Sequence, residues 1–125
     1  MHTDSVPFHI TSERVGDTVV VHVAGELDCS TADELTEALV LAELEVVPPA
    51  PVVVDLTELR FLGAAGIGVL LDHQDLCLRR GGVLLVVANS TAVLRPIRAL
   101  ELADVLCLRA STSDACAYSM GGIRR

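Results

Sequence analysis

The sequence predicts a single α/β domain in which helices pack on a mixed sheet that begins with an antiparallel hairpin. Two wholly apolar runs, residues 52–54 and 83–87, are typical of strands that are buried on both faces of a parallel sheet. Segments with the apolar spacing of helices alternate with these runs, so helical crossovers between parallel strands are expected. At 125 residues, with 51% hydrophobic and 2% aromatic residues, the chain is long enough for one aliphatic core.

The chain opens with a predicted β-hairpin. Residues 8–15 alternate apolar and polar side chains, Gly16-Asp17 is a turn signal, and residues 18–24 are rich in valine. Two strand-like runs on either side of a Gly-Asp turn are typical of an antiparallel hairpin. The hairpin delivers the chain to the polar segment 25–28.

A first helix is expected over residues 31–45. Thr31 and Glu34 have the spacing of a capping box, in which each side chain binds a backbone N–H at the helix start. The apolar face of this helix consists of Leu35, Ala38, Leu39 and Ala42. The proline-rich residues 47–51 cannot continue the helix and predict a surface connection.

A strand over residues 52–54, ending at Asp55, is expected in the middle of the sheet. A connecting segment leads from it to Gly63-Ala64-Ala65-Gly66, a loop without bulky side chains. A second helix is predicted over residues 65–80. Its end is marked by two arginines followed by two glycines at 79–82, because cations and glycine are favoured at helix C-termini.

The C-terminal part is expected to add an apolar strand over 83–87, a third helix after the polar residues 89–91, and a last short strand over 105–108. Pro96 should kink the third helix or delay its start, because proline lacks a backbone donor. A small closing helix is predicted over 112–119.

All of residues 1–125 are assigned to one domain, with a core at about 8–116 and a loose tail over 117–125. The longest nearly apolar stretch, residues 61–71, falls short of the roughly 18 residues that a membrane span needs. The first residues carry no secretory leader. These features predict a soluble cytoplasmic protein, a monomer or a weak dimer.

The uneven charge limits the kinds of partner. The formal net charge is −8; residues 1–50 carry ten acids against one arginine, and residues 51–125 carry seven acids against eight arginines. An acidic half repels nucleic acid and anionic lipid and attracts a basic partner. The alternative is that these charges form only a soluble acidic surface.

The four cysteines show no Cys-x-x-Cys pair and no zinc or small-disulfide spacing, so neither a metal site nor a cofactor is expected. Free thiols are predicted, with Cys77 and Cys107 packed as small apolar residues in a helix and a strand. A redox role for these two thiols is the alternative.

Function is expected in the loops where strands meet helix starts. In the first of these loops, Asp28 and Ser30 either contact a partner or only satisfy backbone donors near the helix cap. The second loop, residues 63–66, lies where unpaired amides suit a phosphate or a closely approaching partner. A phosphate would require Lys, Ser or Thr beside the glycines, and the chain contains no Lys. A tight turn for close packing is the alternative.

Signatures of enzymes are absent from the sequence. It contains no Gly-x-Ser-x-Gly elbow, no His-Glu-x-x-His and no Walker-type loop. His73 lies between Asp72 and Asp75 on the second helix, but neighbours in a helix point to different faces. A receiver domain would use an Asp such as Asp55 together with a Lys, which this chain lacks. A non-catalytic protein is therefore expected.

Two motifs in this order resemble the STAS domain of anti-sigma factor antagonists. The residues concerned are Gly25-Glu26-Leu27-Asp28 with Thr31-Ala32, and Val53-Val54-Asp55-Leu56 leading to Phe61-Leu62-x-x-x-Gly66-Ile67-Gly68-Val69-Leu70. The resemblance extends from about Phe8 to Cys116. It implies a protein that binds a kinase-type anti-sigma factor and thereby frees a sigma factor, in partner-switching control of a stress response.

The resemblance also implies an off-switch, since the kinase phosphorylates a serine in an Asp-Ser-Ser-Gly or Asp-Ser-Thr-Gly loop of the family. Here the corresponding residues are Gly63-Ala64-Ala65-Gly66, and Ala64 at the acceptor position has no hydroxyl. The predicted protein is an antagonist that is not switched by phosphorylation there. Its expected partner-binding residues are Asp28, Ser30, Gly63, Ala64, Ala65 and Gly66. The alternative is a STAS scaffold or regulatory subunit of a stress-sensing assembly or a transporter.

Overall fold

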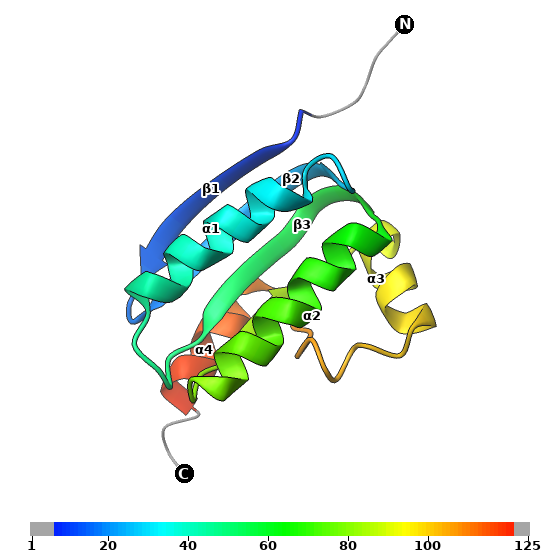
Figure 1. Ribbon diagram of the computed structural model, residues 1–125. Coiled ribbons are helices and arrows are strands. Elements are labelled where there is room, and N and C mark those ends of the chain that lie inside the picture. The colour runs from blue at the N-terminus through cyan, green and yellow to red at the C-terminus, as the bar shows by residue number, and fades with distance from the viewer. Residues whose placement is uncertain (1–6, 122–125) are drawn as a thin grey trace, which may run out of the picture.

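Four strands form one sheet in the order β1-β2-β3-β4, and the computed structural model describes residues 7–121 (Figure 1). Strand β1 pairs with β2 in the antiparallel sense, whereas β2–β3 and β3–β4 are parallel pairs. The mixed α/β fold with an N-terminal hairpin is therefore confirmed. In chain order the elements are β1 (His9–Val15), β2 (Thr18–Leu27), α1 (Ala32–Glu45), β3 (Val52–Leu62), α2 (Ala64–Arg79), β4 (Leu84–Val87), α3 (Thr91–Ala99) and α4 (Thr112–Gly121).

Helices cover the sheet unequally. Helices α1 and α2 lie side by side on one face, and α4 lies behind the sheet on the other (Figure 1). The buried strands contribute side chains to the core on both faces of the sheet, because successive side chains of a strand point to opposite faces. Val19, Val21 and Val54 belong to the core under α1 and α2, whereas Val20 and Val53 pack with Ala115 of α4.

Strand β3 is longer than predicted. It continues for seven residues beyond Asp55, to Leu62. Its second half still pairs with β2, and register shifts lie between His22 and Ala24 and between Gly25 and Glu26. Such irregularities raise the local twist and redirect side chains. Asp55 therefore lies within a strand rather than at its end.

The start of α1 is where predicted, but the capping box is wrong. Thr31 occupies the N-cap position without a side-chain cap hydrogen bond. Its Oγ1 instead donates to the backbone oxygen of Glu26 at 2.9 Å and accepts from the N–H of Asp28 at 3.0 Å. The hydroxyl is thus used to shape the loop that precedes the helix.

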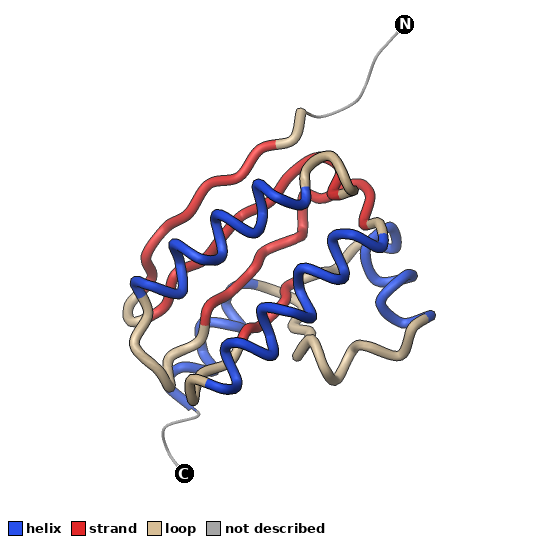
Figure 2. Tube along the Cα trace, in the orientation of Figure 1, coloured by secondary structure: helices blue, strands red, loops and turns tan. Residues whose placement is uncertain are grey.

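The predicted strand over residues 105–108 is also wrong. Within residues 7–121, Arg109 alone forms an isolated bridge with β4, to Val87, and the segment before it belongs to the long loop between α3 and α4 (tan in Figure 2). The N–H groups of Leu106 and Cys107 donate back to Leu102 and Asp104. Cys107 has a φ of 50°. Turn hydrogen bonds and a left-handed residue are incompatible with a continuous strand.

A glutamine side chain occupies the edge of β4 at Leu84, whereas the backbone of Leu106 and Arg109 forms hydrogen bonds with Val86 on the same edge. Gln74 of α2 is 2% exposed. Its Oε1 accepts from the N–H of Leu84 at 2.9 Å, and its Nε2 donates to the backbone oxygens of Leu84 at 2.8 Å and Val105 at 2.9 Å. One side chain therefore joins α2, β4 and the loop that follows α3.

The remaining helices agree closely with the sequence. Helix α3 begins at Thr91 and contains Pro96 in its last turns without a delayed start. Proline lacks one donor, and the helix ends at Ala99, one turn beyond it. Helix α4 continues to Gly121, so residues 117–121 of the predicted tail are helical, and residues 122–125 lie outside the described residues.

Candidate functional site

The two predicted loops lie against each other at one end of the sheet. The N–H of Gly63 donates to the backbone oxygen of Leu27 at 2.9 Å. Gly66 is buried, and a Cβ at its position would lie 2.6 Å from the Leu27 side chain. The start of α2 therefore packs directly on the end of β2. The absence of a side chain at Gly66 is what permits this approach.

The loop between β2 and α1 is organised by its own polar groups. One carboxylate oxygen of Asp28, Oδ1, accepts from the N–H of Ser30 at 2.9 Å and from its Oγ at 2.7 Å. Hydrogen bonds from the Ser30 hydroxyl and backbone lower the pKa of Asp28, so this carboxylate is charged at neutral pH. Ser30 is exposed and Asp28 is half-buried. The loop thus presents a fixed negative charge.

The start of α2 presents backbone and small side chains. Gly63 is the N-cap residue and offers no side-chain hydrogen bond. Ala64 is exposed, Gly63 and Ala65 are half-buried, and Gly66 is buried against Leu27. Unpaired amides of a first helical turn and the positive end of the helix dipole remain available to a partner.

An aromatic side chain beside this surface was not predicted. Phe61 is 48% exposed, and a Cβ at Gly63 would lie 3.0 Å from its Cε2. Side chains alternate between the two faces of a strand, so a strand predicted to reach Leu62 would have indicated which way Phe61 points. The strand was instead predicted to end at Asp55. Exposed aromatic rings are frequent anchors of protein interfaces. We define the loop surface as Phe61, Gly63, Ala64 and Ala65 together with Asp28 and Ser30.

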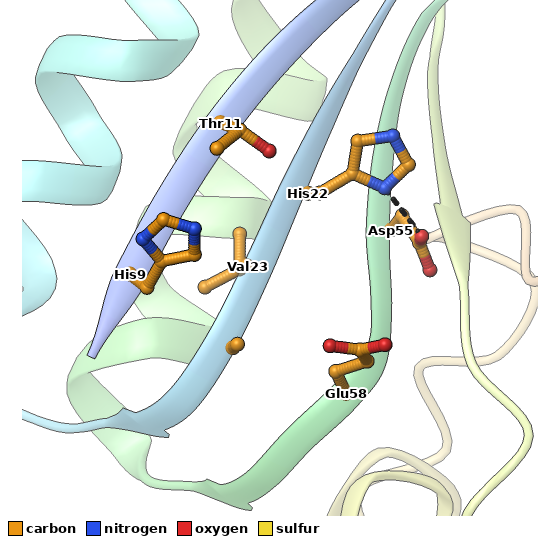
Figure 3. A pocket seen from close by; sticks show the side chains of 7 residues that line it. His9, Thr11, His22, Val23, Asp55 and Glu58 are labelled. Carbon is orange, nitrogen blue, oxygen red and sulfur yellow. Dashed lines mark hydrogen bonds and ion pairs between the residues drawn. The ribbon is translucent and has the colours of Figure 1, made fainter. Parts of the chain in front are cut away.

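A second polar site lies on the sheet face that α4 leaves uncovered. His22 and Asp55 follow Val20 and Val53 at intervals of two residues, so they share the face on which α4 packs. They border a pocket of about 240 Å³ (Figure 3). Its lining consists of His9, Thr11, His22, Val23, Ala24, Asp55 and Glu58.

His22 joins three strands in this pocket. Its Nδ1 lies 2.6 Å from Oδ2 of Asp55 on β3, and its Nε2 lies 3.2 Å from Oε2 of Glu13 on β1. Only the imidazolium form donates from both nitrogens. Partial burial by itself lowers the pKa of His22, but the hydrogen bonds to Asp55 and Glu13 outweigh it and raise the pKa above 6.5.

We expect this raised pKa to make stability depend on pH. A group whose pKa is higher in the folded state stabilises the fold below its unfolded value and loses that effect as pH rises through the folded value. The free energy of unfolding should therefore fall as the pH rises above 6.5 through the raised pKa of His22, and it should fall less in His22→Gln. Urea titrations at a series of pH values from 6.5 upward measure the difference, and an NMR pKa for His22 below 6.5 would contradict it.

A buried carboxylate lies between α1 and α2. The side chains of Glu43 and His73 are each 5% exposed, and His73 Nδ1 lies 2.7 Å from Glu43 Oε2. The Sγ of Cys77 lies 3.8 Å from the same oxygen, and Arg80 approaches the other oxygen at 3.8 Å. Cys77 and His73 thus both contact the carboxylate of Glu43. Within residues 7–121, no hydrogen bond joins a histidine nitrogen to the Cys77 thiol. This is not the geometry of an activated nucleophile.

The thiol at Cys77 is chemically suppressed. Burial, followed by the charge and hydrogen bond of Glu43, raises the pKa of Cys77 to about 12. The Sγ of Cys107 lies 3.7 Å from Nε2 of Gln74. All four cysteines are free, and the redox role of Cys77 and Cys107 stays a prediction.

Alkylation should distinguish the thiols. In the native protein at pH 8, we expect iodoacetamide to modify exposed Cys29 at least tenfold faster than Cys77, because the thiolate is the reacting species. Peptide mass spectrometry over time measures both rates. Equal rates in the native protein would contradict the suppressed thiol, and urea-unfolded protein is the control in which they converge.

Neither a metal cluster nor a membrane span is found in the described part of the chain. Within residues 7–121, no three His, Cys, Asp or Glu side chains are placed to hold one metal ion. None of the helices over the same residues is both long and apolar enough to cross a bilayer.

Comparisons with known proteins agree on one family. Residues 9–115 match the model of the STAS domain. The chain is 30% identical over 105 residues to the anti-sigma-F factor antagonist RsfA of Mycobacterium tuberculosis, covering 84% of this chain and 82% of that protein. The crystal structure of an anti-sigma factor antagonist from Mycobacterium paratuberculosis superposes with a TM-score of 0.82 at 30% identity, over 93% of this chain and 98% of the other. The unphosphorylated antagonist SpoIIAA shares the fold, with a TM-score of 0.70 at 20% identity over 94% and 100% of the two chains.

Proposed function

Because this chain belongs to the STAS-domain family, we propose that it binds a kinase-type anti-sigma factor and so releases a sigma factor. The antagonist role is supported by the similarity to RsfA and to the mycobacterial antagonist structure. Binding of a kinase-type partner is supported by the sequence resemblance. As a partner of the transcription machinery, the protein would act in the cytoplasm.

The observation that carries the proposal is the composition of the loop surface, which we propose binds the anti-sigma factor and call the antagonist surface from here on. Where the resemblance implies a phosphorylated serine, this chain has Ala64, which is exposed in the first turn of α2. A methyl group accepts no phosphoryl group. The proposed antagonist therefore remains competent to bind while its kinase partner holds ATP.

The surface has the properties of a binding surface rather than of a catalytic one. It combines an exposed aromatic ring, Phe61, with the fixed charge of Asp28 and a small apolar helix start. A partner that packs closely on Ala64 and inserts beside Phe61 would gain apolar burial, and its basic groups would face Asp28. We propose that the protein acts by binding alone.

The test is binding of the purified, reduced protein to each anti-sigma kinase encoded in the same genome, by titration calorimetry with and without Mg-ATP. We expect one or more kinases to bind with affinities that ATP does not reduce over time. Phosphate incorporation into the chain together with ATP-dependent release would overturn the phosphorylation-independent part. Failure to bind any of the kinases would overturn the antagonist itself.

A further inference from the structure

The C-terminal half of α1 is apolar on two opposite faces. Leu35, Leu39 and Ala42 are buried against the sheet, as an amphipathic helix requires. On the outer side, Val40 is 43% exposed, Leu41 61% and Leu44 74%. Residues three and four apart on a helix are neighbours, so these three side chains form one continuous patch. A contiguous apolar patch on the solvent-facing side of a helix indicates an interaction site.

The patch continues into a hollow between α1 and the edge strand β1. Leu41 lines this hollow, about 490 Å³ in volume, together with Ile10 and Ala38. Glu34 and Glu37 line it as well. We call the whole feature the α1 groove; it consists of Ile10, Glu34, Glu37, Ala38, Val40, Leu41 and Leu44.

The border of the α1 groove is acidic. Helix α1 contains five acids and no basic residue. Among the described residues, no hydrogen bond or ion pair reaches the carboxylates of Glu34 and Glu37. The nearby arginines are engaged within the chain, since Arg14 donates to the backbone oxygen of Glu45 at 2.6 Å and Arg80 faces Glu43. A partner would therefore meet unpaired negative charge beside apolar side chains.

The exposed leucines of the α1 groove are separate from the antagonist surface. The antagonist surface lies where α1 and α2 begin (Figure 1), whereas Leu41 and Leu44 belong to the later turns of α1. From Ala32 to Leu44 the helix rises by roughly 18 Å. The apolar end of the groove is thus distant from the antagonist surface, whereas Glu34 lies in the first turn of α1, next to the loop that carries Ser30.

We propose that the α1 groove binds an amphipathic helix of another protein, whose apolar face is bordered by arginine or lysine. Apolar side chains of that helix fill the hollow beside Ile10 and Ala38 and cover Leu41 and Leu44, as in helix-in-groove recognition. Its basic side chains pair with Glu34 and Glu37. A second copy of this chain fits poorly, because it would bring the same acids together, and an anionic membrane would be repelled.

The probe is a synthetic peptide of about 18 residues, made of Leu, Ala and Arg, with Leu at helical spacing and Arg along both borders. A scrambled peptide of the same composition controls for charge. We expect the ordered peptide to bind at least tenfold tighter than the scrambled one, by fluorescence anisotropy. The double variant Leu41→Ser/Leu44→Ser should abolish this preference, and Leu100→Ser, which removes an equally exposed leucine at the end of α3, should keep it.

Each other result overturns the proposal. Equal binding of ordered and scrambled peptides would show that only charge attracts them, and an unchanged preference in the double variant would place the site elsewhere. Sedimentation that reveals a dimer lost in Leu41→Ser/Leu44→Ser would assign the groove to a second copy. Circular dichroism of each variant shows that the fold is kept, since the exchanged leucines are exposed. Because the probe is not an anti-sigma factor, this test is independent of the proposed antagonist function.

Discussion

Replacing Gln74 by leucine is expected to lower the free energy of unfolding by about 4 kcal/mol. The buried amide satisfies three backbone groups, the N–H and oxygen of Leu84 and the oxygen of Val105. Leucine has nearly the same size but no polar atom, so the N–H and oxygen of Leu84 would stay buried without partners, and the partly buried oxygen of Val105 would lose its donor. Each such group costs about 1 to 3 kcal/mol, only partly offset by the apolar side chain.

Urea unfolding monitored by circular dichroism measures this loss. The matched control is Asp75→Ala at the next residue. It removes an exposed ion pair in which Oδ2 of Asp75 lies 2.9 Å from Nη2 of Arg79. That pair should contribute at most about 1 kcal/mol. A Gln74→Leu variant as stable as the control would show that β4 does not depend on the amide, and that water or a shifted loop replaces it.

The elements predicted best are those whose sequence has a single interpretation. An alternating run before Gly16-Asp17 and a valine-rich run after it specify a hairpin, and the crossover helices follow from apolar spacing. The edge of β4 has no such signature. A run such as residues 105–108 has strand propensity, but the chain turns at Cys107, and a glutamine from α2 takes over the hydrogen bonds of Leu84. Tertiary contacts between distant segments override local preference there.

The candidate site was predictable to the extent that it lies in loops next to strand ends. The two loops that carry Asp28 and residues 63–66 adjoin, because the N–H of Gly63 donates to the backbone oxygen of Leu27. Phe61 was missed because β3 continues past Asp55 through a register shift that no local pattern reveals. His22 was missed for a related reason: its partners, Glu13 and Asp55, lie on two other strands, and only the sheet register brings them together.

The start of α2 allows a direct test of the antagonist surface, since Ala64→Asp adds a charge without harming the helix. A carboxylate in the first turn interacts favourably with the helix dipole, so the stability of the fold should be unchanged or slightly higher. Binding to the anti-sigma factor should weaken at least tenfold, about 1.4 kcal/mol or more, because a closely packed contact would have to bury the new charge. Titration calorimetry with the partner found for the wild-type protein measures the change.

The control for added charge is Ala117→Asp, an exposed position on α4, which packs on the opposite face of the sheet. The net charge of the two variants is equal, so long-range repulsion affects both alike. A loss confined to Ala64→Asp therefore arises from contact at the start of α2. If both variants bind as the wild type does, the partner does not pack on Ala64, and the antagonist surface must lie elsewhere on the domain. If both lose affinity equally, net charge alone governs the encounter, and the local packing argued for Ala64 is wrong.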